Sequence, residues 1–363
     1  MARVLLRELR KNFDEIEAVK NLNLEVKDRE FVCLLGPSGC GKTTTLRMIA
    51  GLEEPTSGEI YIGERLVNDL EPEERDVAMV FQFYALYPSL DVYGNLAFPL
   101  RAMKLPKKEI DKRVRETAER LGLLHILHKR ARQLTSGEAQ RVALGRAIIR
   151  RPQVYLLDEP LSNLDASLRV AMRGELKRMQ KELAQTTIYV THDQVEAMAL
   201  ADRIAVMSKG ELQQYEPPAK IFNNPRNMFV AGFIGSPPMN FIECEILDRG
   251  VGMALRFNDN YIDVQDFSDL IRRNAQGNEV VLGVRPQDIH VDPKETGGDS
   301  FKAEVYVVEP LAEETILRLK LDGLIITASS TLNYNWKVGE RVWIKLDRSK
   351  IHIFDRRTGN AIV

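Results

Sequence analysis

Residues 36–44 read GPSGCGKTT, and this stretch decides the fold. The loop follows the apolar run FVCLL (31–35) and precedes a helical pattern, which is the strand, turn and helix order of a phosphate-binding loop. Glycines in such a loop let backbone N–H groups turn toward phosphate oxygens, and the positive end of the next helix adds to their field. We therefore expect nucleotide contacts from the whole loop, which comprises Gly36, Pro37, Ser38, Gly39, Cys40, Gly41, Lys42, Thr43 and Thr44.

Two side chains of this loop have predicted roles of their own. Lys42 can bridge the outer phosphates of a nucleotide, and the hydroxyl of Thr43 is placed to bind Mg²⁺. A merely structural glycine-rich turn has no need of Lys-Thr at these positions. The loop does not distinguish kinases, GTPases, helicases and transport ATPases, so the class depends on the rest of the chain.

Composition narrows the field. The chain has 363 residues, enough for two domains, and its net charge of −1 gives no indication of nucleic-acid binding. No apolar run approaches the roughly 18–20 residues of a membrane span, and the N-terminus lacks a signal-peptide core. The three cysteines are too few and too scattered for a disulfide framework or a zinc site. We expect a protein that is cytosolic or lies on the cytosolic face of a membrane.

The first two thirds of the chain alternate helical and strand patterns, which predicts an α/β domain. Residues 106–122 begin with proline, end with glycine and place apolar residues at helical spacing, and residues 166–183 repeat that spacing. Short apolar strands are expected at 154–158 and 187–191. Each ends in a polar residue, at the strand end where open α/β sheets bind ligands.

The composition changes at 235–240, where two adjacent prolines disfavour helix and central strand. We expect a linker at 236–240. Beyond it, apolar residues alternate with polar ones at 303–307, 317–321 and 342–346, which predicts a small β-barrel or β-sandwich.

Three polar residues after the expected strands are candidates for chemistry. Asp158 can hold Mg²⁺ at the end of its apolar strand, and the adjacent Glu159 can polarise an attacking water. His192 follows the next strand and would lie beside the phosphate loop if the two strands are neighbours. A single histidine is more often structural, so its predicted role depends on that neighbourhood.

Taken together, the motifs resemble those of ABC-type ATPases, most closely the ATPase subunits of maltose-type carbohydrate importers. They occur in that family's order: GPSGCGKTT as Walker A, MVFQFYALYP (79–88) as Q-loop, QLTSGEAQRVALGRA (133–147) at the signature position, VYLLDEP (154–160) as Walker B, SNLD (162–165) as D-loop and VTHD (190–193) as H-loop. The likeness continues into the C-terminal domain through GFIGSPPMNF (232–241), GVRPQD (283–288) and IHIFDRRTGNAI (351–362).

The resemblance implies an ATPase domain at 1–235 with a helical subdomain at about 89–150, and a β-rich, oligonucleotide-binding-like domain at 241–363 that regulates and helps dimerise. It implies ATP and Mg²⁺ as cofactors, and catalytic roles for Lys42, Glu159 and His192. The further nucleotide contacts that it implies are Phe13 under the adenine, Gln82, Thr135, Ser136, Gly137, Glu138 and Asp165. The metal ligands that it implies are Thr43, Gln82 and Asp158.

The signature segment departs from the family pattern. The usual Leu-Ser-Gly-Gly-Gln is here Leu-Thr-Ser-Gly-Glu (134–138), so Ser136 adds a Cβ and Glu138 a negative charge near the expected γ-phosphate. Both changes could impair turnover. The same residues also have the form of a capping box, in which Thr135 caps the helix and Glu138 bonds back to the Thr135 N–H. Sequence alone leaves retained but slower turnover and real degeneracy both open.

The resemblance also implies partners. Two subunits, as a homodimer or a heterodimer, would sandwich two ATPs head to tail, and residues 84–90, from Tyr84 to Leu90, would receive a membrane permease. The assembly would lie on the cytoplasmic face of the cell membrane, with an extracytoplasmic solute-binding protein as an indirect partner and no nucleic acid. The resemblance favours sugar as cargo, while polyamine, sulfate and iron importers use similar ATPases. A soluble ABC ATPase would show paired cassettes, a coiled coil or a basic face, and a phosphate-loop kinase would not need SNLD.

Overall fold

The computed structural model describes residues 2–81, 86–162, 164–248, 250, 252–295, 297, 300–312, 314–331 and 334–363. The chain divides into two compact units, Met1–Pro218 and Ala219–Val363. Each unit has its own hydrophobic core. The α/β and all-β classes expected for the two parts are confirmed.

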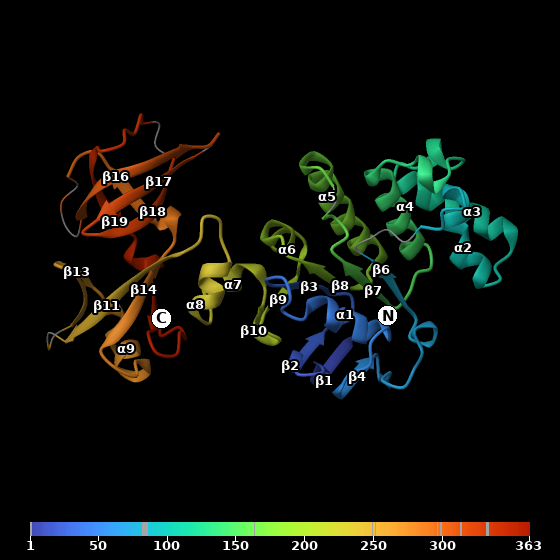
Figure 1. The fold of residues 1–363 in the computed structure, drawn as a ribbon, viewed down its shortest axis with the longest axis horizontal. Coiled ribbons are helices and arrows are strands. Elements are labelled where there is room, and N and C mark those ends of the chain that lie inside the picture. The colour runs from blue at the N-terminus through green and yellow to red at the C-terminus, as the bar shows by residue number, and fades with distance from the viewer. Residues whose placement is uncertain are drawn as a thin grey trace. The chain divides into compact units, whose positions relative to one another are not determined.

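A six-stranded sheet forms the centre of the first unit, with strand order β10-β9-β3-β8-β7-β6 (Figure 1). All neighbours are parallel except β10, which pairs antiparallel with β9. The strands are β3 (Phe31–Leu35), β6 (Val77–Val80), β7 (Val154–Asp158), β8 (Thr186–Thr191), β9 (Arg203–Ser208) and β10 (Glu211–Glu216). Every residue of β3, β7 and β8 is buried, as expected for central strands of a sheet that is covered on both faces.

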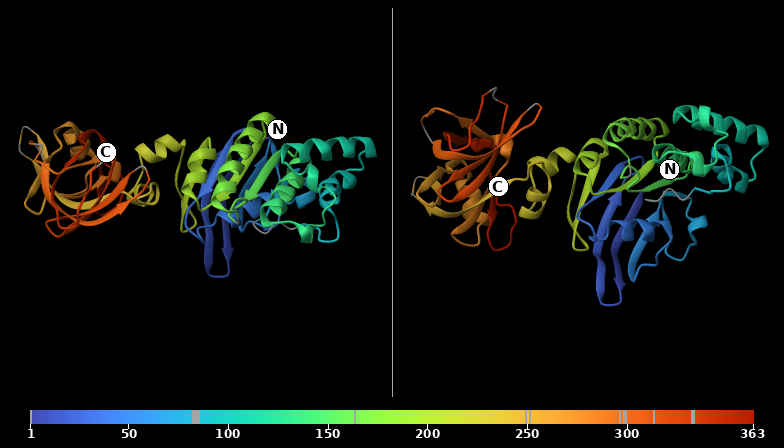
Figure 2. Two further views of the ribbon diagram at one scale, coloured as in Figure 1. Left: turned by 90° about the horizontal axis from the view of Figure 1, so that it is seen from above. Right: turned by 45° about the horizontal axis from the view of Figure 1, so that its top comes forward.

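A second, antiparallel sheet of order β2-β1-β4-β5 covers one side of helix α1 (Lys42–Ala50). Its strands are β1 (Val4–Phe13), β2 (Ile16–Val26), β4 (Ser57–Ile62) and β5 (Arg65–Leu66). Because α1 also contacts β6, β7 and β8, it lies in a core shared by the two sheets. The β1–β2 ribbon extends beyond the rest of the unit (Figure 2).

Three helices, α2 (Val92–Ala102), α3 (Lys107–Arg120) and α4 (Ser136–Ile148), pack against one another at one side of the unit (Figure 1). Helix α3 confirms the helix expected within 106–122. Helices α5 (Ala166–Leu183) and α6 (Gln194–Leu200) cover the face of the six-stranded sheet opposite α1. The bounds of α5 agree with the expected helix, and two of its methionines, Met172 and Met179, are buried as core residues.

The second unit consists of two five-stranded antiparallel sheets around one core, with orders β13-β12-β11-β14-β20 and β15-β19-β16-β17-β18. The strands of the first sheet are β11 (Asn240–Asp248), β12 (Met253–Phe257), β13 (Asn260–Asp263), β14 (Glu279–Val284) and β20 (His352–Asp355). Those of the second are β15 (Ile289–Asp292), β16 (Ser300–Pro310), β17 (Thr315–Leu321), β18 (Leu324–Ser330) and β19 (Arg341–Leu346). Helix α9 (Ser268–Asn274) lies between β13 and β14 in the sequence. The alternation read from 317–321 and 342–346 places the apolar side chains in this core.

The division between the units lies at 218/219, earlier than the expected linker at 236–240. The helices α7 (Pro218–Asn223) and α8 (Met228–Phe233) lie before that linker, yet they are held by the β-rich unit. The buried Arg285 guanidinium donates from Nη2 to the Phe222 carbonyl at 2.6 Å and from Nη1 to the Ile234 carbonyl at 2.7 Å. Ala231 and Met239 pack with residues of β14 and β20 in a cluster of their own. Sequence composition marks the two prolines but not this tertiary anchor.

Across the described parts of the chain, no helix combines the length and the apolar character that crossing a membrane requires.

The core of the second unit gives a test of stability. Leu319 on β17 is fully buried, so Leu319→Ala should lower the free energy of unfolding of this unit by about 2–5 kcal/mol. Both tryptophans, Trp336 and Trp343, belong to this unit, so tryptophan fluorescence during urea unfolding reports on it alone. Ile325→Ala on the neighbouring strand is the matched control, because that side chain is 57% exposed. Equal destabilisation by the two changes would contradict this core assignment.

Candidate active site

The candidate site lies where three neighbouring parallel strands end. Strand β8 lies between β3 and β7, with Leu35 opposite Thr191 and Asp158 opposite Val190. The loop after β3, the acidic pair at the end of β7 and the histidine after β8 therefore meet at one edge of the sheet. The condition placed on His192, that its strand be a neighbour of the loop strand, is met.

Tight backbone packing shapes the phosphate loop. Gly41, the N-cap of α1, has a φ of 100°, and a Cβ on it would lie 2.5 Å from the Ala18 carbonyl oxygen. A Cβ on Gly36 would lie 2.2 Å from the carbonyl oxygen of Met207. Only glycine fits at both positions without moving main chain. The loop is thus packed closely between β2 and β9.

Lys42 is nearly fully buried at the start of α1. Its Nζ donates to the carbonyl oxygens of Gly36 at 2.8 Å and of Pro37 at 2.9 Å, so the ammonium group lies against the inside of the loop. A charged group this deeply buried needs partners, and these two carbonyls supply them. The anionic oxygens of a phosphate would be stronger acceptors at the same place.

Thr43 and Asp158 are brought together as a metal site requires. The Thr43 hydroxyl donates to Asp158 Oδ1 at 3.0 Å. Burial raises the pKa of Asp158 above its usual value, and the hydrogen bond from Thr43 opposes that rise. A divalent cation would compensate a buried carboxylate directly, and hydroxyl and carboxylate oxygens are ligands that Mg²⁺ accepts. The donor set therefore fits the ion that the sequence predicts.

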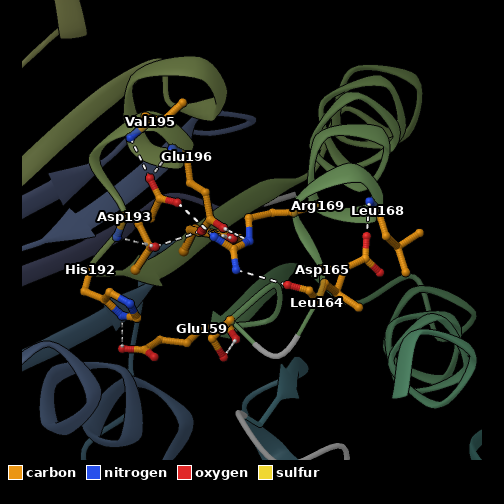
Figure 3. A network of polar contacts seen from close by, with 12 residues as sticks. Glu159, Leu164, Asp165, Leu168, Arg169, His192, Asp193, Val195 and Glu196 are labelled. Carbon is orange, nitrogen blue, oxygen red and sulfur yellow. Dashed lines mark hydrogen bonds and ion pairs between the residues drawn. The ribbon is translucent and has the colours of Figure 1, made fainter. Parts of the chain in front are cut away.

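Glu159 and His192 form a contact across the site. The Nδ1 atom of His192 lies 3.2 Å from Oε1 of Glu159, with the imidazole more exposed than the carboxylate (Figure 3). Glu159 has a φ of 45°, which is unusual for a residue with a side chain. Its N–H donates to the Val190 carbonyl at 3.0 Å, which holds the strained turn in place. Strain of this kind concentrates at functional sites.

An open cavity of about 490 Å³ lies at this point. Its volume is within the range of small-molecule sites, and its wall combines backbone N–H donors, an ammonium, a carboxylate and an imidazole. The residues that line it are Ala18, Ser38, Gly39, Gly41, Lys42, Thr43, Thr44, Glu159 and His192. Sequence reasoning found every one of these except Ala18, which faces the cavity from β2.

The signature residues open helix α4 as a complete capping box. Thr135 Oγ1 accepts from the Glu138 N–H at 3.3 Å, and Glu138 Oε2 accepts from the Thr135 N–H at 2.8 Å. The other carboxylate oxygen of Glu138 lies 3.1 Å from Lys129 Nζ, an ion pair that the sequence pattern does not indicate. The hydrogen bond from the Thr135 N–H makes the largest contribution to lowering the pKa of Glu138, and the contact with Lys129 lowers it further.

Asp165 caps the next long helix, α5, by accepting from the Leu168 N–H at 2.9 Å. The two helix starts are adjacent, because a Cβ on Gly137 would lie 2.5 Å from Leu168 Cδ2. The structure thus joins the signature and D-loop residues to each other. Within this one chain, the described residues of the two segments are not among those that line the cavity at Lys42.

One predicted nucleotide contact, Phe13, stands apart from this cluster. Phe13 is the last residue of β1 and is 42% exposed. Lys11 Nζ lies 4.8 Å from the centre of its ring. Phe13 is not among the described residues that line the cavity. Gln82 and Tyr84 lie outside the described residues.

Sequence reasoning missed a polar network beside His192. Arg169 on α5 reaches the Leu164 carbonyl, Asp193 and Glu196, and the last two belong to the start of α6 (Figure 3). Only the tertiary fold brings α5 and α6 together, so no local motif could have indicated these contacts.

Comparison with known families agrees with this geometry. Residues 19–162 match the model of the ABC transporter family, residues 235–289 the MalK OB fold domain and residues 282–354 the TOBE domain. The trehalose/maltose import ATP-binding protein MalK of Thermococcus litoralis is 52% identical, over the full length of both chains. The chain belongs to the ABC transporter family. As an ABC ATPase it binds ATP and hydrolyses it.

Other relatives within the family are similar over comparable lengths. The oligosaccharides import ATP-binding protein MsmX of Bacillus subtilis is 44% identical over 99% of each chain. Among solved structures, the dimeric ABC transporter cassette MJ0796, bound to ADP and Pi in a post-hydrolysis state, is 34% identical. It covers 59% of this chain and 98% of its own, with a TM-score of 0.55. The ABC ATPase unit is therefore the part shared with that cassette.

The capping box of this ABC ATPase yields a stability prediction. Thr135→Ala removes the hydroxyl that caps α4 and should lower the free energy of unfolding by about 0.5–2 kcal/mol. Thr135→Ser keeps the hydroxyl and should unfold like the wild type. Urea unfolding followed by far-ultraviolet circular dichroism, without nucleotide, measures both. A serine variant as unstable as the alanine variant would show that the cap contributes nothing.

Proposed function

We propose that this ABC ATPase powers the import of a sugar from the cytoplasmic face of the cell membrane, as one half of a head-to-tail dimer bound to a membrane permease. The observation that carries the proposal is the meeting of the phosphate loop, the Thr43–Asp158 pair and the Glu159–His192 pair at three neighbouring strand ends. Together they provide a phosphate cradle, a metal position and a water-activating pair.

Thr43, Asp158 and Gln82 are the proposed ligands of Mg²⁺, directly or through water. The ion would neutralise charge on the outer phosphates of ATP. Mg²⁺ commonly takes only one or two protein oxygens and completes its shell with phosphate and water. A site with few protein ligands is consistent with the described residues, which contain no group of three or more His, Cys, Asp or Glu able to hold a metal.

Glu159 is the proposed group that polarises the attacking water. Its carboxylate lies on the cavity wall, and its contact with His192 Nδ1 orients both side chains. In the doubly protonated imidazolium both ring nitrogens are donors, so Nδ1 would donate to Glu159 while the other ring nitrogen of His192 donates to an oxygen of the transferred phosphoryl group. Lys42 and His192 would then stabilise charge that develops as the bond to the leaving phosphate breaks.

A second subunit supplies what one cavity lacks. The signature residues 135–138 and Asp165 lie together, away from the Lys42 cavity of their own chain. A two-fold pair of chains would bring each such group to the partner's nucleotide, so neither site is complete alone. The ion pair with Lys129 and the bond to Thr135 turn the charge of Glu138 away from that position, which supports retained turnover.

The permease is proposed to dock on residues 84–90. Of this segment, residues 86–90 are described, and all of them are half-buried or exposed. The ring centres of Tyr87 and Phe98 lie 4.3 Å apart in a tilted arrangement, and both residues are exposed. Exposed aromatic pairs of this kind are typical centres of protein interfaces. A sugar as cargo is supported by relatives named for the import of trehalose/maltose and of oligosaccharides.

Glu159→Gln tests the chemistry. The amide cannot take a proton, so steady hydrolysis should fall by at least about 10²-fold while the phosphate cradle persists. Phosphate release measures turnover, binding of a fluorescent ATP analogue measures affinity, and size exclusion with ATP should show a trapped dimer. Glu64→Gln, at an exposed glutamate distant in sequence from every motif, is the control. Turnover within a few-fold of the wild type would remove Glu159 from the proposed role.

Leu86→Asp tests the permease surface. A carboxylate in the proposed docking segment should abolish solute uptake in cells, while the purified chain keeps its basal ATPase activity and its melting temperature. Leu66→Asp places the same charge on an exposed leucine outside the docking segment and should leave uptake unchanged. Labelled disaccharide and labelled sulfate distinguish the cargo classes. Normal disaccharide uptake by the Leu86 variant would contradict the docking site.

A further inference from the structure

One guanidinium group connects the D-loop to the segment that carries His192. Arg169 lies on the first turn of α5, and its Nη2 donates to the Leu164 carbonyl at 3.1 Å. Its Nη1 lies 3.5 Å from Asp193 Oδ2, and its Nε lies 3.9 Å from Glu196 Oε1. Leu164 immediately precedes the D-loop Asp165, and Asp193 immediately follows His192. The planar fork of arginine suits such a junction because it presents several donors in fixed directions.

Glu196 needs this cation. Its side chain is only 4% exposed, and burial raises its pKa while hydrogen bonds and the charge of Arg169 oppose that rise. Glu196 Oε2 accepts from the hydroxyls of Tyr189 and Thr191, both at 2.8 Å. A carboxylate buried without a cation is strongly unfavourable. Arg169 therefore stabilises the acceptor to which the end of β8 is attached.

Both chain neighbours of His192 are held by the same group of residues. Thr191 donates to Glu196, and its hydroxyl accepts from the Asp193 N–H at 3.0 Å. Asp193 Oδ1 caps α6 through the N–H groups of Val195 at 2.8 Å and Glu196 at 3.2 Å. Asp193 Oδ2 is turned to Arg169 instead. The backbone on either side of the imidazole is thus fixed by bonds that converge on Arg169 (Figure 3).

We propose that Arg169 is a positioning residue: it couples the position of the His192 side chain to the position of the D-loop. A shift of the Leu164 carbonyl moves the guanidinium, and the guanidinium carries Asp193 and Glu196 with it. The D-loop is expected at the subunit interface. Hydrolysis in one chain therefore depends on how its own D-loop packs against the partner subunit. The inference rests on the proposed role of His192.

Arg169→Ala tests the inference. The imidazole should lose its alignment, while the cavity should keep its nucleotide contacts. We therefore expect kcat to fall by about tenfold to a hundredfold, with KM for ATP within about twofold of the wild-type value. His192→Ala should lower kcat by about 10²–10³-fold. In the double variant the two losses should not multiply, because Arg169 acts through His192. A structural role alone would give losses that multiply.

Two further variants act as controls on folding and on charge. Asp193→Asn keeps the oxygen that caps α6 but replaces the oxygen that faces Arg169, so it should repeat the kcat loss even if Arg169→Ala folds poorly. Arg178→Ala removes another arginine of α5, whose partners Glu175 and Glu182 lie on the same helix, and should leave kcat unchanged.

The outcomes separate the two proposals. If His192→Ala turns over like the wild type, the role of His192 fails and the inference fails with it. If His192→Ala is slow, the proposed site stands, and the Arg169 series decides the inference alone. Normal kcat in both Arg169→Ala and Asp193→Asn, or losses that multiply with His192→Ala, would overturn it.

Discussion

The site depends on the parallel pairing of β8 between β3 and β7. That pairing sets the ends of three strands side by side, so residues separated by more than a hundred positions in sequence come within hydrogen-bonding distance. Thr43 and Asp158 are one such pair. A slip of one residue in β7 would exchange its inward and outward side chains and remove Asp158 from Thr43. The buried apolar residues of these strands therefore position the polar ones.

Much of this arrangement could be predicted from the sequence, because its signals are local. Apolar runs identified β3, β7 and β8, and the spacing of Thr135 and Glu138 indicated the capping box that the structure contains. The glycines of the phosphate loop are also recognisable locally, although the carbonyl oxygens that they admit come from β2 and β9. These features need only a few adjacent residues, so a reader of the sequence has all the information.

What the sequence did not reveal depends on tertiary contact. Lys129 reaches Glu138 because the loop before α4 folds back, and Arg169 reaches Asp193 because α5 and α6 lie together. Neither pair has a characteristic spacing. The antiparallel sheet formed by β1, β2, β4 and β5 was not anticipated, although one of its residues, Ala18, lines the cavity. Long-range polar contacts of this kind are determined by the fold, and they produce no periodic pattern in the sequence.

The anchor formed by Arg285 has a consequence for how such proteins are recombined. Because α7 and α8 belong to the β-rich unit, the segment that joins the two compact units is the short Pro217-Pro218 stretch after β10. A graft made at the proline pair 237–238 would leave Arg285 facing foreign carbonyls and would cut through the cluster around Met239. A graft at 217–218 transfers each body whole. The position best suited to exchanging the β-rich unit between such ATPases is thus some twenty residues upstream of the one that composition suggests.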